Sequence, residues 1–140
     1  MGVAEHDIRA LVHDLYGAYE RRDFDRVIAF LHDDVDWIIH APVRMFAFAG
    51  QRKGRKAALE ALGAIAAEYQ LESYKPQVII VDGNRAAVLS DVKFVQRSTN
   101  RMMRFQVVNF LRFEGGKVIE FREFTNTLEL AEQVFGRYLS

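Results

Sequence analysis

The side chain best suited to move a proton in this 140-residue sequence is His40. It ends a run of β-branched and aromatic residues, 35–40, which predicts a short strand before Pro42. A neutral imidazole accepts a proton near pH 7, so we expect His40 to be the base if the protein is an enzyme. The alternative is a histidine that is only hydrogen-bonded at the end of a strand.

Two further polar residues interrupt apolar patterns and could bind a ligand oxygen. Tyr16 shares a helical face with Val12 and Tyr19, so its phenol is expected to point into the interior. Asn109 interrupts an alternating strand pattern whose other members are Met103, Phe105, Val107, Leu111 and Phe113. Each has a structural alternative, Tyr16 as a core residue with a satisfied hydroxyl and Asn109 as a partner of a neighbouring strand.

Asp91 is a third candidate for a catalytic role. It lies between Leu89 and Val95, where burial would raise the pKa of its carboxyl group and equip it as an acid. Pairing of Asp91 with Lys93 or Arg104 is the alternative.

Aromatic residues and the last strand are expected to complete a ligand site. Trp37, Phe46 and Phe48 would supply an aromatic wall, although each also fits a plain core. Arg122 and Glu123 are neighbours in a strand and face opposite sides of the sheet, so only one of them reaches the interior. We take Glu123 as a candidate ligand-binding residue.

Several other chemistries do not fit the sequence. There is no cysteine, which excludes disulfides, thiolate nucleophiles and zinc-thiolate sites. The histidines at positions 6, 13, 32 and 40 form no metal-ligand motif, and residues 50–54 have the wrong spacing for a phosphate loop. We therefore expect neither a metal nor a cofactor.

Composition points to one folded domain spanning residues 1–140. Half of the residues are hydrophobic and 11 are Phe, while Lys+Arg and Asp+Glu are balanced at 19 each. A neutral chain has no long-range attraction for nucleic acid. The sequence shows neither a basic leader nor about 18 uninterrupted apolar residues, so we expect no membrane partner and a cytoplasmic location.

The hydrophobic period changes along the chain from helical to strand-like. Spacings of three and four predict a helix over residues 7–22, and Asp23 can cap a shorter helix that ends near residues 32–34. A turn at residues 50–54 leads into a third helix. Alternation and turn residues then predict successive antiparallel strands at 72–81, 86–97, 102–114 and 117–126. Helices followed by a strand meander predict an α+β fold.

Some of the predicted strands are apolar on both faces, as in residues 78–81 and 105–111. Helices can cover only one face of the sheet, so we expect a second copy of the chain to cover the other and form a homodimer.

The order of these segments resembles the SnoaL-like, ketosteroid-isomerase-like branch of the nuclear transport factor 2-like superfamily. The resemblance rests on the two-helix start, the runs LHDDVDW at 31–37 and GQRKG at 50–54, and FEGGKVIEFREF at 113–124. It implies a curved antiparallel sheet wrapped by three N-terminal helices around a cone-shaped pocket, as in a cystatin-like roll. Members of this superfamily isomerise ketosteroids, cyclise polyketides, dehydrate or hydrolyse small apolar molecules, or only bind them.

The resemblance also bears on individual residues. Relatives tend to place a catalytic acid or base near the end of the first strand, although ketosteroid isomerases carry Asp where this chain has His40. Ketosteroid isomerases also use a tyrosine of the first helix, as Tyr16 would be, beside a protonated acid. Asn126 falls where many relatives have Asp, and an amide orients a ligand without transferring a proton.

These observations predict a pocket for a small, mainly apolar compound that carries a carbonyl or hydroxyl group. The protein would be a cofactor-independent isomerase, cyclase or dehydratase, or a non-catalytic binding or dimeric interaction module of the same fold.

Overall fold

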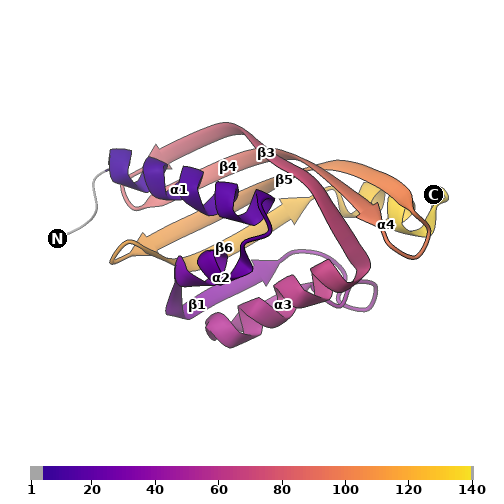
Figure 1. The fold of residues 1–140 in the computed structure, drawn as a ribbon, viewed down its shortest axis with the longest axis horizontal. Coiled ribbons are helices and arrows are strands. Elements are labelled where there is room, and N and C mark those ends of the chain that lie inside the picture. The colour runs from indigo at the N-terminus through magenta and orange to yellow at the C-terminus, as the bar shows by residue number, and fades with distance from the viewer. Residues whose placement is uncertain (1–4, 140) are drawn as a thin grey trace.

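The α+β fold expected from the sequence is confirmed by a computed structural model, which describes residues 5–139 (Figure 1). Residues 1–4, on which the expectation of no leader segment partly rests, and residue 140 lie outside the described part. The elements in chain order are α1 (Glu5–Glu20), α2 (Phe24–Ala29), β1 (Leu31–Ile39), β2 (Gly50–Lys53), α3 (Gly54–Glu68), β3 (Tyr69–Asp82), β4 (Arg85–Gln96), β5 (Arg101–Glu114), β6 (Lys117–Thr125) and α4 (Thr127–Phe135). No helix within residues 5–139 is long and apolar enough to cross a membrane.

The six strands form one curved sheet in the order β2-β1-β6-β5-β4-β3. The hairpins joining β3 to β6 are antiparallel and turn where the sequence predicted them. The pairing of β1 with β6 is parallel, which differs from the wholly antiparallel expectation. The physical reason is the long return path through α3 and the meander, which brings β6 alongside β1 in the same direction.

Three local assignments from the sequence were wrong. Residues 50–53 form strand β2, paired antiparallel with β1, and not a turn. The second helix ends at Ala29, because residues 32–34 already belong to β1. Helix α4 was not predicted, although Asn126 caps it by accepting a hydrogen bond from the Glu129 amide.

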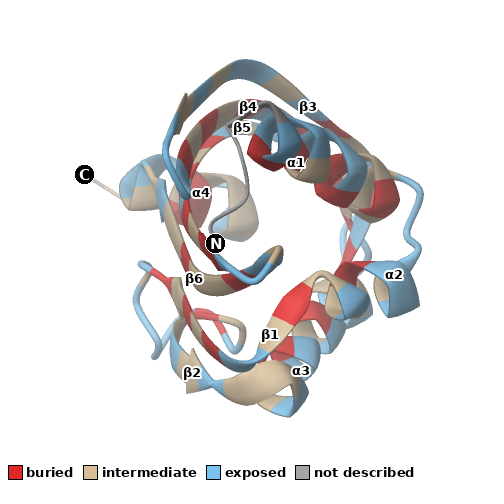
Figure 2. Ribbon diagram, turned by 90° about the vertical axis from the view of Figure 1, so that its left-hand side faces the viewer, coloured by how far each residue is buried: buried red, intermediate tan, exposed pale blue. Residues whose placement is uncertain are grey.

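Buried and exposed residues alternate along the strands, so the sheet has an inner and an outer face (Figure 2). In β1, Val35, Trp37 and Ile39 are buried beneath the helices. Helix α1 lies against β3 and α3 lies against β1, which encloses the inner face from both sides of the curve (Figure 1).

The C-terminal end of α1 is attached to the edge strand β3. Glu20 accepts a hydrogen bond from the Tyr74 amide (2.9 Å) and pairs with Lys75 (2.7 Å). The Arg22 guanidinium donates to the Leu71 carbonyl. Because β3 is at the edge of the sheet, its backbone groups are free to bond these helix side chains, and this fixes α1 over the interior.

Helix α4 buries Leu130 and Ala131 in the core and is also held to the β4–β5 hairpin by polar contacts. The Gln96 amide and the Arg101 guanidinium both donate to the Val134 carbonyl, at 3.0 and 3.2 Å. The Gln133 side chain exchanges two hydrogen bonds with the backbone of Arg104. Gly136 then ends the helix in a left-handed conformation, with φ of 71°.

We expect Gly136→Ala to destabilise the protein more than Gly83→Ala does. Both positions have positive φ, 71° and 59°, which costs an alanine about 1–2 kcal/mol. A Cβ at Gly136 would lie 1.8 Å from Arg101 Nη1, whereas one at Gly83 meets nothing within 4 Å. Displacing Arg101 should add about 1 kcal/mol through its lost hydrogen bonds.

Urea unfolding of the two variants measures this difference. In an Arg101→Ala background the two glycine substitutions should cost the same. Equal costs in the parent background would contradict the proposed contact.

Candidate functional site

A cavity that is open to solvent lies between the helices and the inner face of the sheet. The empty space within it and at its opening amounts to about 970 Å³. Most of its wall is apolar. The aromatic members of the wall are Tyr16, Tyr19, Trp37, Phe48, Tyr69, Tyr74, Phe94, Phe105 and Phe121. Asn109, Glu123 and Thr125 are its other polar members. The polar groups are thus few and gathered on β5 and β6.

Asn109 is the centre of a hydrogen-bond network inside this cavity. Its carbonyl oxygen Oδ1 accepts from the phenols of Tyr16 (2.5 Å) and Tyr74 (3.1 Å). Its amide Nδ2 donates to Glu123 Oε1 at 3.0 Å. The Tyr74 phenol also lies 3.3 Å from the same carboxylate oxygen. Asn109 and Tyr74 therefore both reach the Glu123 carboxylate, while Tyr16 reaches only the Asn109 side chain.

Strand register places these groups together. Asn109 on β5 and Glu123 on β6 are direct cross-strand partners, so their side chains lie side by side on the inner face. Tyr16 reaches them from α1 and Tyr74 from β3, with their ring centroids 5.7 Å apart. Tyr19, one turn after Tyr16, stacks at a tilt against Tyr74 at 5.3 Å.

Burial decides the protonation of these groups. It raises the pKa of the Glu123 carboxyl, and the hydrogen bonds from Asn109 and Tyr74 offset only part of the rise. Burial also raises the pKa of Tyr16, Tyr19 and Tyr74, reinforced by the nearby negative charge of Glu123. The phenols consequently stay protonated and act as donors, while Glu123 is the group that can exchange a proton.

Two atoms of this cluster have no partner among the described residues. Glu123 Oε2 accepts no hydrogen bond, since the two hydrogen bonds to this carboxylate, from Tyr74 and Asn109, both go to Oε1. The Tyr19 hydroxyl makes no hydrogen bond either, although its ring lies against Tyr74. A carboxylate oxygen and a phenol donor are therefore both available to a molecule in the cavity.

The structure brings four of the sequence-predicted site residues to this cavity. Tyr16, Asn109 and Glu123 belong to the network, and Trp37 lines the wall while stacking on Phe121 at 4.0 Å. The Tyr16 hydroxyl donates to the Asn109 side chain, and the Asn109 amide donates to Glu123. Both side chains therefore have the structural hydrogen bonds that the sequence analysis gave as the alternative to ligand binding.

His40 does not reach the cavity, so the expectation that it faces the pocket is wrong. It is exposed and stacks on Phe124 at 4.2 Å, outside the cavity wall. The reason is strand parity, because Trp37 and Ile39 point inward and the next residue must point outward. Asp91 is likewise exposed on the outer side, where it accepts a hydrogen bond from Gln106 at 2.8 Å.

Phe46 and Asn126 also lie outside the cavity wall. Phe46 is buried behind Phe48, with ring centroids 5.3 Å apart, and is part of the core. Asn126 uses its side-chain oxygen to cap α4. Its amide is therefore engaged in the backbone of the helix that follows.

Tyr74 is the cluster residue that the sequence did not reveal. It lies in β3 between two irregularities in the register with β4, near Ser73 and Val78. These shifts break the two-residue alternation that would have assigned Tyr74 to the inner face. Among the described residues, no group of three or more His, Asp or Glu side chains could hold a metal ion.

We expect the free energy of unfolding to depend on pH through Glu123. As pH rises above the ordinary glutamate pKa of 4.5, the unfolded chain ionises before the folded one, so the free energy of unfolding falls. The loss is complete once pH exceeds the raised folded pKa. Glu123→Gln has no such titration, so its stability relative to the parent should increase from about pH 4 to about pH 8.

Urea unfolding at both pH values tests this, with the exposed Glu72→Gln as the matched control. A stability difference between Glu123→Gln and the parent that does not change with pH would contradict the assignment.

Comparison with known proteins agrees with the fold. The family described as SnoaL-like domain matches residues 12–121. Among curated protein sequences, none shows significant similarity to the chain. A solved structure from Rhodopseudomonas palustris, provisionally designated an isomerase, is 27% identical with a TM-score of 0.83 and covers 96% of this chain and 100% of its own.

Two more distant structures support the fold. A nuclear transport factor 2-like protein from Burkholderia pseudomallei is 23% identical, with a TM-score of 0.83 over 91% of this chain and 97% of its own. A protein from Xanthomonas campestris, provisionally designated a polyketide cyclase, is 22% identical, with a TM-score of 0.78 over 93% and 98%. With the family match extending over most of its length, the chain belongs to the SnoaL-like domain family.

Proposed function

We propose that the protein is a cofactor-independent acid–base catalyst for a small apolar compound that carries a carbonyl or hydroxyl group. The observation that supports this most is the half-buried carboxylate of Glu123 in the cavity wall, held by Asn109 and Tyr74 on one oxygen and open on the other. Isomerisation, cyclisation and dehydration of such compounds all require a proton to leave carbon or reach oxygen.

Glu123 is the proposed base. Its Oε2 would take a proton from a carbon next to a carbonyl. The raised pKa of the carboxyl makes Glu123 a stronger base than an ordinary glutamate, which favours this transfer. The hydrogen bonds from Asn109 and Tyr74 hold the carboxylate in one orientation during the transfer.

Tyr19 is the proposed donor to the oxygen that gains negative charge. Its phenol lines the cavity, remains protonated and is unbonded within the described residues. Tyr16 serves differently, because its hydroxyl is bonded to Asn109 and fixes the amide that orients Glu123. A phenol donor that strengthens its bond in the transition state lowers the barrier directly.

A second candidate function is binding without catalysis. The observation in its favour is that the phenols of Tyr16 and Tyr74 both donate to Asn109 and not into the cavity. In that case the hydrogen-bond network would have only a structural role, and the cavity would bind the same class of compound without converting it.

Solvent exchange at carbon separates the two functions. 2-Tetralone, an apolar ketone with acidic protons next to its carbonyl, would be incubated with the protein in D₂O and followed by proton NMR. We expect the protein to accelerate exchange, Glu123→Gln to lose roughly a hundredfold or more of that rate, and Tyr19→Phe roughly tenfold to a thousandfold.

Glu72→Gln, an exposed substitution of the same type, should exchange at the parent rate. Binding of 2-tetralone without accelerated exchange would favour the binding module. Undiminished exchange in Glu123→Gln would remove Glu123 from the mechanism.

We also propose that the outer face of the sheet joins two copies of the chain. Apolar side chains on neighbouring strands remain exposed there, namely Val78 (45%), Ile80 (60%), Phe110 (49%) and Phe124 (41%). The rings of His40 and Phe110 both pack against Phe124 on this face. An exposed apolar patch on the face of a sheet is typical of an interface with a protein partner.

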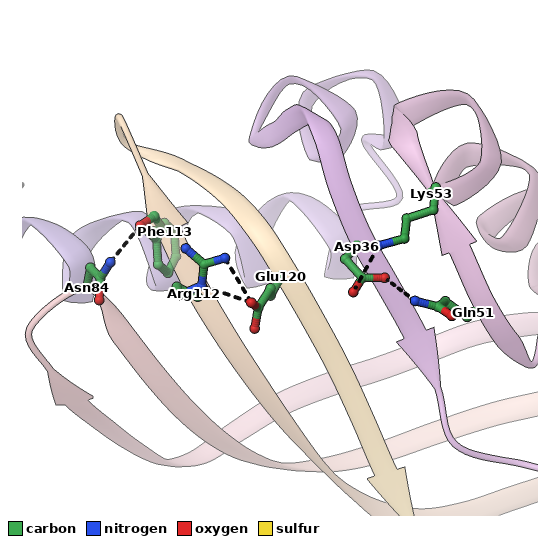
Figure 3. A network of polar contacts seen from close by, with 7 residues as sticks. All are labelled: Asp36, Gln51, Lys53, Asn84, Arg112, Phe113 and Glu120. Atoms are coloured by element: carbon green, nitrogen blue, oxygen red, sulfur yellow. Dashed lines mark hydrogen bonds and ion pairs between the residues drawn. The ribbon is translucent and has the colours of Figure 1, made fainter.

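Two polar pairings lie on strands β5, β6, β1 and β2 of the same sheet (Figure 3). Arg112 binds Glu120 through two hydrogen bonds, at 3.0 and 2.8 Å, and Asp36 bonds Gln51 and pairs with Lys53. Because a two-fold interface places the same surface against itself, a patch with balanced charges suits a second copy of the chain.

Sedimentation equilibrium at micromolar concentration tests the dimer. We expect the parent to be dimeric and Phe110→Glu to be monomeric, because a carboxylate at the centre of the patch would be desolvated. Leu59→Glu, at an exposed apolar residue of α3, should remain dimeric. A monomeric parent would rule out this interface.

A further inference from the structure

The charge inside the cavity is of one sign. Apart from tyrosine phenols, Glu123 is the only ionisable side chain of the wall, and the wall contains no Lys, Arg or His. No ion pair of the described residues includes Glu123, and its pKa is affected by no neighbouring cation. No positively charged side chain of the cavity wall therefore offsets this negative charge.

The surroundings of this carboxylate favour a cation. The rings of Tyr16, Tyr19 and Tyr74 cluster beside it, with centroid separations of 5.7 Å and 5.3 Å around Tyr74. The face of an aromatic ring attracts an ammonium group, and the attraction grows when water is excluded. The carboxylate, which has no ion-pair partner, and the faces of the tyrosine rings therefore both attract a cation.

The same arrangement opposes an anion. A ligand carboxylate would be brought close to Glu123 in an apolar enclosure, where like charges are poorly screened. The wall offers it phenols and one amide, of which the Tyr16 and Tyr74 hydroxyls and the Asn109 amide are already bonded.

We propose that the cavity selects lipophilic amines, bound as ammonium ions to Glu123 Oε2 and the surrounding tyrosine rings, and rejects carboxylates built on the same skeleton. This inference rests on the proposed function in one respect, since both place the ligand against Oε2 of Glu123. An amine would accordingly compete with a neutral carbonyl compound for the same oxygen.

Three probes that share one aromatic skeleton test the selection at pH 7. They are 2-naphthylmethylamine, which is an ammonium ion at this pH, 2-naphthylmethanol, which is neutral, and 2-naphthoate, which is an anion. Isothermal titration calorimetry should show the amine binding at least tenfold more tightly than the alcohol, and no measurable binding of the carboxylate.

Two variants identify the residue responsible. Glu123→Gln should remove the preference for the amine over the alcohol and narrow the gap between the alcohol and the carboxylate. Glu72→Gln, at an exposed position of β3, should keep the parent order of the three affinities. If Glu123→Gln does not fold, the order of the three probes on the parent protein still decides the question.

The outcomes separate this inference from the proposed catalysis. Equal affinities for amine and alcohol, or measurable binding of the carboxylate at the affinity of the alcohol, would overturn the selection whether or not 2-tetralone exchanges its protons. Tight amine binding with no exchange of 2-tetralone would support the selection and contradict the acid–base function. Failure of all three probes to bind would overturn the inference.

Discussion

The partial burial of one carboxylate is the constraint on which the rest of the site depends. Withdrawing a carboxylate such as Glu123 from water is unfavourable unless donors replace the lost hydration. Asn109 and Tyr74 supply those donors to a single oxygen, and the compensation is incomplete because the pKa of the carboxyl remains raised. An incompletely compensated charge is costly for the fold and useful for a site that must exchange a proton or hold a cation.

This constraint explains why distant segments have to meet. Glu123 and its amide donor come from adjacent strands, but the phenols that fix the amide come from α1 and β3. The attachment of Glu20 to the Tyr74 amide and of Arg22 to the Leu71 carbonyl holds that helix and that strand together. We infer that this edge contact sets the geometry of the site from outside the cavity.

Much of the fold could be predicted from the sequence because its signals are local. The helical period of α1, the alternation around Asn109 and the turn residues at 82–84, 98–100 and 115–116 each act within a few residues. Strand β2 and helix α4 were missed because β2 is only four residues long and depends on its pairing with β1, while the polar N-cap Asn126 was interpreted as a ligand contact.

The site was harder to predict because it depends on parity and long-range pairing. Trp37 and His40 are three residues apart in an extended segment and cannot share a face, so assigning both to the pocket was inconsistent with strand geometry. The register irregularities of β3 concealed Tyr74. The pairing of Asn109 with Glu123, which joins two strands, is what places the carboxylate in the cluster.

The most direct test of this account is the titration of Glu123 itself. In protein carrying ¹³C at the glutamate carboxyl carbons, the Glu123 resonance, assigned by comparison with Glu123→Gln, would be followed against pH with and without 2-naphthylmethanol. The account predicts that this carbon titrates above the ordinary glutamate pKa of 4.5 and shifts when the cavity is filled. A carboxyl group that titrates at the ordinary value and does not respond to the ligand would contradict it.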